Sequence, residues 1–153
     1  MTKSLNNANQ LAKHIDYMKT ALSLARRGLG NVWPNPAVGC IIVNNKQIVG
    51  RGWTQPGGRP HAEAMAIKQA GDKAAGGTAY VNLEPCHHLG QSPPCTEALI
   101  TAGIKEVFAS LVDPDPRVAG SGLERLAQAN IAINVGLLRQ PANDINQGFF
   151  TRI

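Results

Sequence analysis

The first regular pattern along the chain is a series of apolar residues at helical spacing. It predicts a helix over residues 10–29, which two nearby glycines would end. The apolar positions are Leu11, Ile15, Met18, Leu22 and Ala25. After a turn rich in Pro and Asn, residues 37–43 and 47–53 have the pattern of two strands joined at Asn44-Asn45-Lys46. The chain is therefore predicted to begin with a helix and a β-hairpin.

Beyond residue 60 the pattern alternates between helices and strands. Helices are predicted over residues 61–74, 93–102, 121–129 and 141–151, and strands over residues 78–83, 105–111 and 131–135. This alternation predicts a mostly parallel sheet with helices on both faces, and the earlier hairpin makes the sheet mixed. The predicted fold class is α/β, with three α/β/α layers around a mixed five-stranded sheet. Ligands of such sheets bind near the carboxyl ends of the strands.

Composition limits the class of protein. Hydrophobic residues make up 43% and charged residues 16% of the 153 residues, which is typical of one globular domain over residues 1–153. The net charge of +5 comes from scattered Lys and Arg, so it does not indicate a nucleic-acid partner. A single anionic small molecule as ligand would fit this charge as well. The first ten residues do not resemble a signal peptide, and no apolar segment is long enough to cross a membrane.

The cysteines change this picture because two of them accompany a histidine and a glutamate. With no export signal, three cysteines favour a reducing cytoplasm over a disulfide framework. His61, Cys86 and Cys95 offer one imidazole and two thiolates, which are ligands that Zn²⁺ prefers. A catalytic zinc site uses three protein ligands and keeps one position open for water. Glu63 can then move protons without binding the metal. Cys40, in the middle of a predicted strand, is interpreted as a buried inert thiol.

The spacing of these residues is related to a known pattern. Zinc deaminases have H-x-E followed by P-C-x-x-C, with the Glu as acid and base. Here His61-Ala62-Glu63 and Pro85-Cys86 match, but eight residues separate Cys86 from Cys95. The alternative is a structural zinc site, which would need a fourth ligand from His87 or His88. Glu63 would then have no role, so the catalytic interpretation is preferred.

The motifs together resemble those of the cytidine-deaminase superfamily, and within it the deaminase half of the bifunctional riboflavin-biosynthesis deaminase/reductase. The resemblance runs from about residue 10 to the C-terminus, and the eight-residue gap between the cysteines is typical of that family. The stretches that carry it are Asn35-Pro36-Ala37-Val38-Gly39, Pro60-His61-Ala62-Glu63, Leu83-Glu84-Pro85-Cys86, Pro93-Pro94-Cys95, Asp113-Pro114-Asp115-Pro116 and Val118-Ala119-Gly120-Ser121-Gly122.

The resemblance implies an activity and a set of site residues. Family members hydrolyse an exocyclic amino group of a diaminopyrimidinone that carries ribose 5-phosphate, and they release ammonia. Zinc ligands are implied at His61, Cys86 and Cys95, with Glu63 as the proton shuttle. Substrate contacts are implied in three segments, with Asn35, His88, Gln91, Asp113, Asp115, Gly120 and Ser121 as the candidates. A homo-oligomer is also implied, because family members complete or border their pockets with neighbouring subunits.

Two details of the substrate loops bear on the ligand. The backbone N–H groups of Gly120-Ser121-Gly122, before a predicted helix, could hold a phosphate, although an ordinary helix start is the alternative. Glu84 is interpreted as a brace for the metal loop rather than as a second acid. The reductase half of the family is missing from these 153 residues, so we expect a fragment or a free-standing deaminase.

Four positions depart from the family pattern. Thr54, His87, Gln91 and Asp115 stand where the family usually has His, Ser, a cation and Asn. Arg59 and Arg117 are the nearest cations that could replace the one missing at residue 91. Two other functions stay open at this point. One is the same chemistry on a free base, a nucleoside or a tRNA base, and the other is a non-catalytic zinc-stabilised binding subunit that needs no Glu63.

Overall fold

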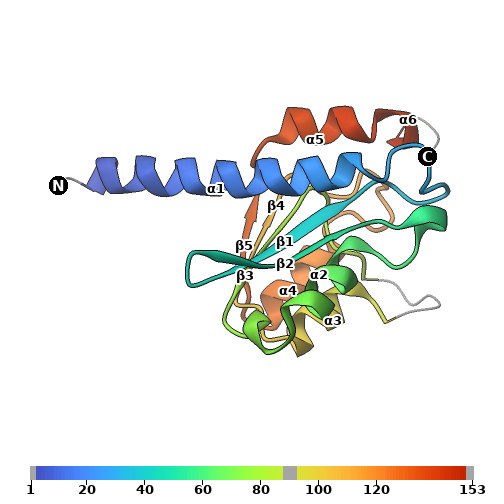
Figure 1. Cartoon of the computed structure of the whole chain (residues 1–153). Helices are drawn as coiled ribbons and strands as arrows, with labels where there is room; N and C mark the ends of the chain where they lie inside the picture. The colour runs from blue at the N-terminus through green and yellow to red at the C-terminus, as the bar shows by residue number, and fades with distance from the viewer. Residues whose placement is uncertain (1–2, 88–92, 151–153) are drawn as a thin grey trace.

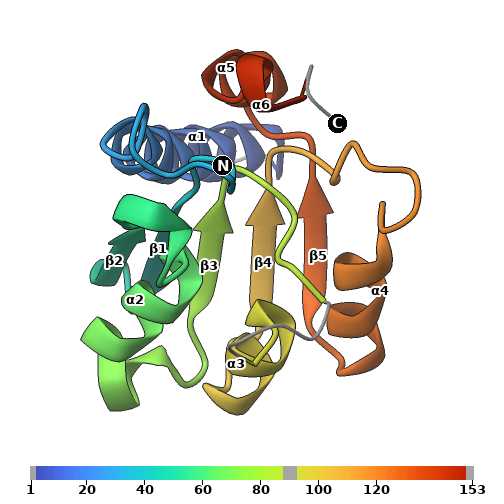
Figure 2. The same ribbon diagram turned by 90° about the vertical axis from the view of Figure 1, so that its right-hand side faces the viewer.

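Five strands form one mixed sheet in the computed structural model of the chain, which describes residues 3–87 and 93–150. The strands are β1 (Gly39–Asn44), β2 (Gln47–Trp53), β3 (Thr78–Val81), β4 (Glu106–Ala109) and β5 (Ala132–Val135). Their order across the sheet is β2-β1-β3-β4-β5, which Figure 2 shows from one side. Strand β1 is antiparallel to β2 and β3, whereas β3, β4 and β5 are parallel. The predicted mixed five-stranded sheet is confirmed.

Helices cover both faces of this sheet (Figure 1). One face carries α1 (Lys3–Arg26), α5 (Arg139–Ile145) and α6 (Gln147–Phe150), and the other carries α2 (Ala62–Ala70), α3 (Cys95–Thr101) and α4 (Ser121–Gln128). Alternate side chains of β1 enter the two cores, because successive residues of a strand point to opposite faces. Ile42 belongs to the core on the side of α2, α3 and α4, and Ile41 belongs to the core on the side of α1. No helix in the described part of the chain is long and apolar enough to cross a membrane.

Small residues let α2 lie close against the sheet. Ala62, Ala66 and Ala70 recur every four residues on one face of α2, and all three are buried. Opposite them on β2 stand Gly50 and Gly52, where an added Cβ would collide with the α2 backbone. This close contact determines where the first turn of α2 lies, and that turn contains the histidine and glutamate of the predicted site.

Two predicted helices divide into shorter elements. The helix predicted over residues 61–74 ends at Ala70, where Gly71 has a φ of +55°, and a 3-10 turn (Gly71–Ala74) follows. Another 3-10 turn (Pro56–Gly58) precedes this helix in the loop after β2. The helix predicted over residues 141–151 is α5 and α6, separated at Asn146. Its periodicity does not show the break, because the Asn146 side chain bonds to a distant segment.

The distant segment is the start of the first predicted strand, which begins at Gly39 instead of residue 37. The N–H of Ala37 donates to Asn146 Oδ1 at 2.7 Å, and the N–H of Val38 donates to Thr54 Oγ1 at 3.0 Å. These side-chain bonds replace the sheet hydrogen bonds that a longer strand would make. α1 extends from Lys3 to Arg26, so it begins before the predicted residue 10 and ends before residue 29.

Candidate active site

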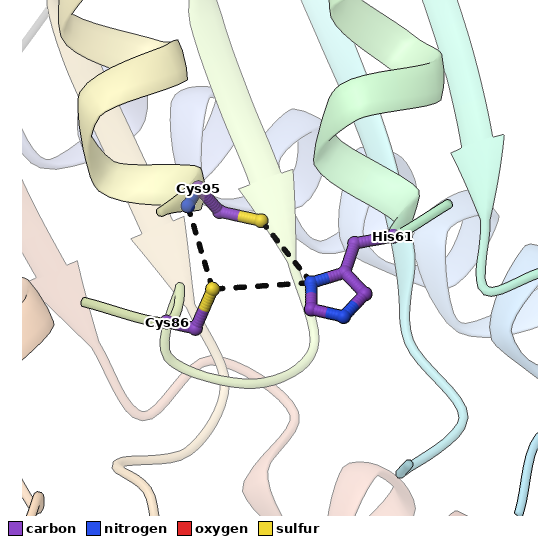
Figure 3. A group of neighbouring side chains, drawn as sticks. All are labelled: His61, Cys86 and Cys95. Carbon is purple, nitrogen blue, oxygen red and sulfur yellow. Dashed lines mark hydrogen bonds between the residues drawn. The ribbon is translucent and has the colours of Figure 1, made fainter. Parts of the chain in front are cut away.

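Three potential metal ligands meet at the ends of three elements (Figure 3). His61 immediately precedes α2, Cys86 lies in the loop after β3, and Cys95 is the first residue of α3. His61 Nδ1 lies 3.8 Å from Cys86 Sγ and 3.4 Å from Cys95 Sγ. The three ligand atoms all lie within 4.8 Å of one another. Zn–N bonds of about 2.0 Å and Zn–S bonds of about 2.3 Å at tetrahedral angles separate ligand atoms by roughly 3.5–3.8 Å. The group therefore fits one zinc ion.

The two thiols differ in acidity. The hydrogen bond from the Cys95 thiol lowers the pKa of Cys86 to about 4, and the His61 ring acts in the same direction. The backbone N–H of Cys95 also donates to Cys86 Sγ at 3.4 Å. The pKa of Cys95 is raised because its thiol is the donor in this pair and is largely buried. The Cys86 thiol is therefore the more acidic of the two, and a bound metal ion favours the thiolate form of both.

Glu63 lies in the first turn of α2, two residues after His61, and is only 4% exposed. Burial, followed by the negative charge of Cys86, raises the pKa of its carboxyl group to about 7. The Cys95 thiol is within hydrogen-bonding reach of the same carboxyl group. A carboxyl group that titrates near neutrality can both take up and release a proton. The position of Glu63 therefore suits proton transfer beside the three ligands.

His87 is one of the two histidines that could supply the fourth ligand of a structural zinc site. Its Nδ1 lies 2.9 Å from the hydroxyl of Thr96, a fully buried residue of α3. Glu97, the next residue, is held by two hydrogen bonds from Arg125 of α4, each 3.0 Å long. His87 thus contacts α3, and the metal-ligand group found among residues 3–87 and 93–150 has three members. Three ligands suit a catalytic rather than a structural zinc site. His88, the other candidate, lies outside the described residues.

A sequence profile described as the cytidine and deoxycytidylate deaminase zinc-binding region matches residues 11–111. The chain belongs to this deaminase family. The match covers both metal-binding segments, so the prediction of a zinc site is confirmed at the level of the family and by the position of the three ligands.

Relatives within the deaminase family agree with this assignment. Riboflavin biosynthesis protein RibD of Escherichia coli is 53% identical over 137 residues, which are 90% of this chain but 37% of that protein. The diaminohydroxyphosphoribosylamino-pyrimidine deaminase of Buchnera aphidicola is 48% identical over 139 residues, which are 91% of this chain and 95% of that protein. A solved structure of Acinetobacter baumannii RibD has a TM-score of 0.90 at 46% identity, over 93% of this chain and 40% of that one. The predicted fold is confirmed.

One predicted substrate residue of this deaminase, Asn35, lies in a segment held from several sides. Its Nδ2 donates to the carbonyl oxygen of Gly58 at 2.8 Å. Two buried asparagines, Asn82 and Asn146, form hydrogen bonds with the backbone of Ala37. Asn82 also accepts the N–H of Gly39. Neither asparagine was predicted from the sequence as part of the site. An isolated Asn between apolar residues, as in Val81-Asn82-Leu83, is the feature that could have identified the first of them.

Thr54 belongs to the same set of contacts. Its side chain is buried, and its hydroxyl accepts the Val38 N–H and lies 3.3 Å from the carbonyl oxygen of Pro36. The departure from the family pattern at this position therefore has a local consequence. Thr54 holds the Asn35 segment in place, and its hydroxyl group is hydrogen-bonded within the protein.

The second predicted substrate loop, residues 113–122, is organised by Glu84. One oxygen of this buried carboxylate accepts the N–H groups of Asp113 and Gly120, at 2.9 and 3.0 Å. The other oxygen accepts those of Gly122 and Leu123, at 2.9 and 3.1 Å. The phosphate hypothesis for Gly120-Ser121-Gly122 is not supported, because Glu84 accepts the N–H groups of both glycines and the carbonyl oxygen of Val118 accepts that of Ser121 at 3.0 Å. The interpretation of Glu84 as a brace agrees with these contacts, although the brace acts on this loop.

Within that loop Asp115 is paired. Arg117 contacts the two Asp115 carboxylate oxygens, with a shortest distance of 2.7 Å, and its guanidinium lowers the pKa of Asp115 to about 2. The N–H of Asp115 donates to Asp113 Oδ1 at 2.9 Å. Ser121 donates its hydroxyl to the carbonyl oxygen of Val118 at 2.7 Å. The negative charge that departs from the family pattern is therefore balanced within the loop.

The structure brings some predicted substrate residues to the metal group. Asp113 and Ser121 line a cavity of about 20 Å³ together with Cys86 and His87. Asn35 lines a different pocket of about 340 Å³, between the end of α1 and the α5–α6 segment. Gln91, like His88, lies outside the described residues. The substrate roles of all these residues stay predictions.

Proposed function

We propose that this chain is a zinc-dependent hydrolytic deaminase that acts on the diaminohydroxy-phosphoribosylamino-pyrimidine intermediate of riboflavin biosynthesis. The observation that carries the chemistry is the convergence of His61, Cys86 and Cys95 beside the buried carboxyl group of Glu63. The substrate is supported by the Buchnera relative, which is a diaminohydroxyphosphoribosylamino-pyrimidine deaminase and of which this chain covers 95%. The RibD proteins are longer, so their other activities are not transferred to this chain.

The residues divide the reaction between them. His61 Nδ1 and the thiolates of Cys86 and Cys95 would hold the zinc ion, which, when bound, makes a water molecule much more acidic. Glu63 accepts the two protons of the attacking water in turn and delivers one to the ring nitrogen and the other to the departing amine, while the water oxygen bonds to the ring carbon that loses the amine. Ammonia leaves, and a carbonyl group remains on the ring. The burial of Glu63 keeps bulk water from competing for these protons.

The remaining residues would orient the substrate. We assign the base and ribose phosphate to the region between Asn35 and the 113–122 loop, where Asp113 and Ser121 lie beside Cys86. Arg59, which is exposed two residues before His61, is the cation that we assign to the phosphate. Arg117 is the second candidate, and it forms an ion pair with Asp115.

A panel of substrates tests this assignment. Ammonia release should be most efficient, as kcat/KM, on the riboflavin intermediate, compared with cytidine, cytosine, guanine and tRNA adenosine. Loss of one charged hydrogen-bond partner costs about 1.5–3 kcal/mol. Arg59→Met should therefore weaken binding of the phosphorylated substrate by roughly ten- to a hundredfold, with Arg26→Met as the matched control. Turnover of another substrate but not of the riboflavin intermediate would refute the assignment. If Gln91→Lys improves efficiency, residue 91 lies near the phosphate.

We also propose that the chain forms a homo-oligomer in a reducing, cytoplasmic environment. All three cysteines are free thiols, and two of them are candidate metal ligands. Leu29 and Trp33 are 48% and 61% exposed beside the pocket that Asn35 lines, and an apolar surface of this kind suits contact with a second copy. Sedimentation should give a mass of at least twice 16.2 kDa. A single species of monomer mass at working concentration would contradict this prediction.

A further inference from the structure

We propose that Glu84 is a positioning residue that couples the Cys86 metal loop to the 113–122 loop. Glu84 lies two residues before Cys86, and its side chain is 6% exposed. Its own N–H donates to the carbonyl oxygen of Leu111 at 2.9 Å, so its backbone is also tied to the strand end that precedes the loop. The link to catalysis rests on the proposed function, whereas the link between the two loops rests on contacts alone.

The donors around Glu84 match a carboxylate and not an amide. Four backbone N–H groups, two for each oxygen, point at the side chain at 2.9–3.1 Å. Three of them belong to the start of α4, where the helix dipole also favours a negative charge. A glutamine at this position keeps one acceptor oxygen but turns an NH₂ group toward two N–H donors. At least two of the four donors would then lose their partner.

Close packing supports the same coupling. Gly122, in the first turn of α4, lies against the carbonyl oxygen of Pro85, where an added Cβ would collide. The α4 backbone is therefore in direct contact with the residue that precedes Cys86. Glu84 holds the two segments together by hydrogen bonds, and Gly122 leaves no space between them. A shift of the 113–122 loop would accordingly be transmitted to a metal ligand.

The N-terminus of α4 could bind either a substrate phosphate or an anionic side chain of the protein itself. Backbone N–H groups at a helix start are suited to bind an anion. In this chain the anion is the side chain of Glu84, which is built into the protein. The helix start thus serves to place Asp113 and Ser121 beside Cys86, and the substrate phosphate must be bound by other groups.

Amide hydrogen exchange on the metal-loaded protein, measured residue by residue, tests the coupling without reference to activity. In the wild type, the amides of Asp113 and Gly120 should be protected although both lie outside helices and strands. In Glu84→Gln these amides and those of Gly122 and Leu123 should exchange roughly tenfold faster or more, since bonds to charged groups are the stronger ones. Glu106→Gln is the matched control, because Glu106 is a half-buried carboxylate at the opposite end of the sheet that accepts one bond from Asn134.

Kinetics and metal content complete the test. Glu84→Gln should retain zinc and raise KM for the riboflavin intermediate more than it lowers kcat, because the loop carries substrate contacts and Glu63 is untouched. Unprotected Asp113 and Gly120 amides in the wild type would overturn the coupling even if the variant failed to fold. Faster exchange with unchanged kinetics would overturn the positioning role. Absence of turnover in the wild type would refute the proposed function alone, while the exchange rates would still decide the link between the loops.

Discussion

Glu63→Gln is expected to lose nearly all deaminase turnover while keeping the fold and the zinc. Glutamine is nearly isosteric with glutamate but cannot accept a proton. General acid–base groups contribute about a hundred- to ten-thousand-fold to rates, and a residue that serves several transfers should lie at the upper end. Because Glu63 is buried beside the metal group without being one of the three ligands, its loss should change kcat far more than zinc content. Ammonia release and metal analysis on the same preparation measure both quantities.

The control for this prediction is Glu124→Gln, which removes an exposed carboxylate from the first turn of α4. It should leave kcat within about twofold of the wild type, because substitution of an exposed surface side chain usually has a small effect. Rates close to the wild type in Glu63→Gln would refute the acid–base role. They would leave the metal assignment standing and would favour the reading of the chain as a zinc-binding subunit.

Cys86→Ser and Cys95→Ser are each expected to lose most of the bound zinc and, with it, turnover. The wild type should hold about one zinc ion per chain, because the three ligand atoms lie within 4.8 Å of one another, close enough to share one ion. A serine hydroxyl remains protonated at neutral pH and is a poor ligand for this metal compared with a thiolate. Metal analysis after dialysis against a mild chelator, with mass spectrometry of the intact chain, measures the loss directly.

Cys40→Ala serves as the thiol control. Cys40 is fully buried in the core, and the metal group among the described residues does not include it. The variant should keep its zinc, although the smaller side chain costs some stability. Full retention of zinc in both serine variants would exclude the three-ligand assignment.

Local chemistry explains why part of the site could be predicted. A zinc site of this kind needs particular residue types. His61, Glu63 and Cys86 lie in short local motifs, which can be recognised in the sequence before the fold is known. The order of elements was equally accessible, because the alternation of strands and helices beyond residue 60 leaves few topologies for a sheet. The position of both motifs at strand ends followed from that order.

Long-range side-chain contacts account for what could not be predicted. Asn146 ends a helix and bonds to Ala37, 109 residues away, so the periodicity around residue 146 carries no sign of it. Gly120 and Gly122, at the start of α4, have the sequence of a phosphate-binding helix start, yet Glu84 accepts their N–H groups from 36 and 38 residues away in the chain. A backbone N–H can bind a ligand only if no side chain of the folded protein already accepts its hydrogen bond.

The sequence by itself therefore determined the fold class, the candidate metal ligands and the residue that we assign to proton transfer. These depend on hydrophobic periodicity and on the intrinsic chemistry of imidazole, thiol and carboxyl groups. Only the tertiary structure decided how the loops around that set are held. Thr54 braces the Asn35 segment, Asp115 is neutralised by Arg117, and Glu84 joins the metal loop to the 113–122 loop. The physical reason is that a polar side chain forms its hydrogen bonds and ion pairs with residues that become its neighbours only when the chain folds. The pattern of residues along the sequence does not show which residues these are.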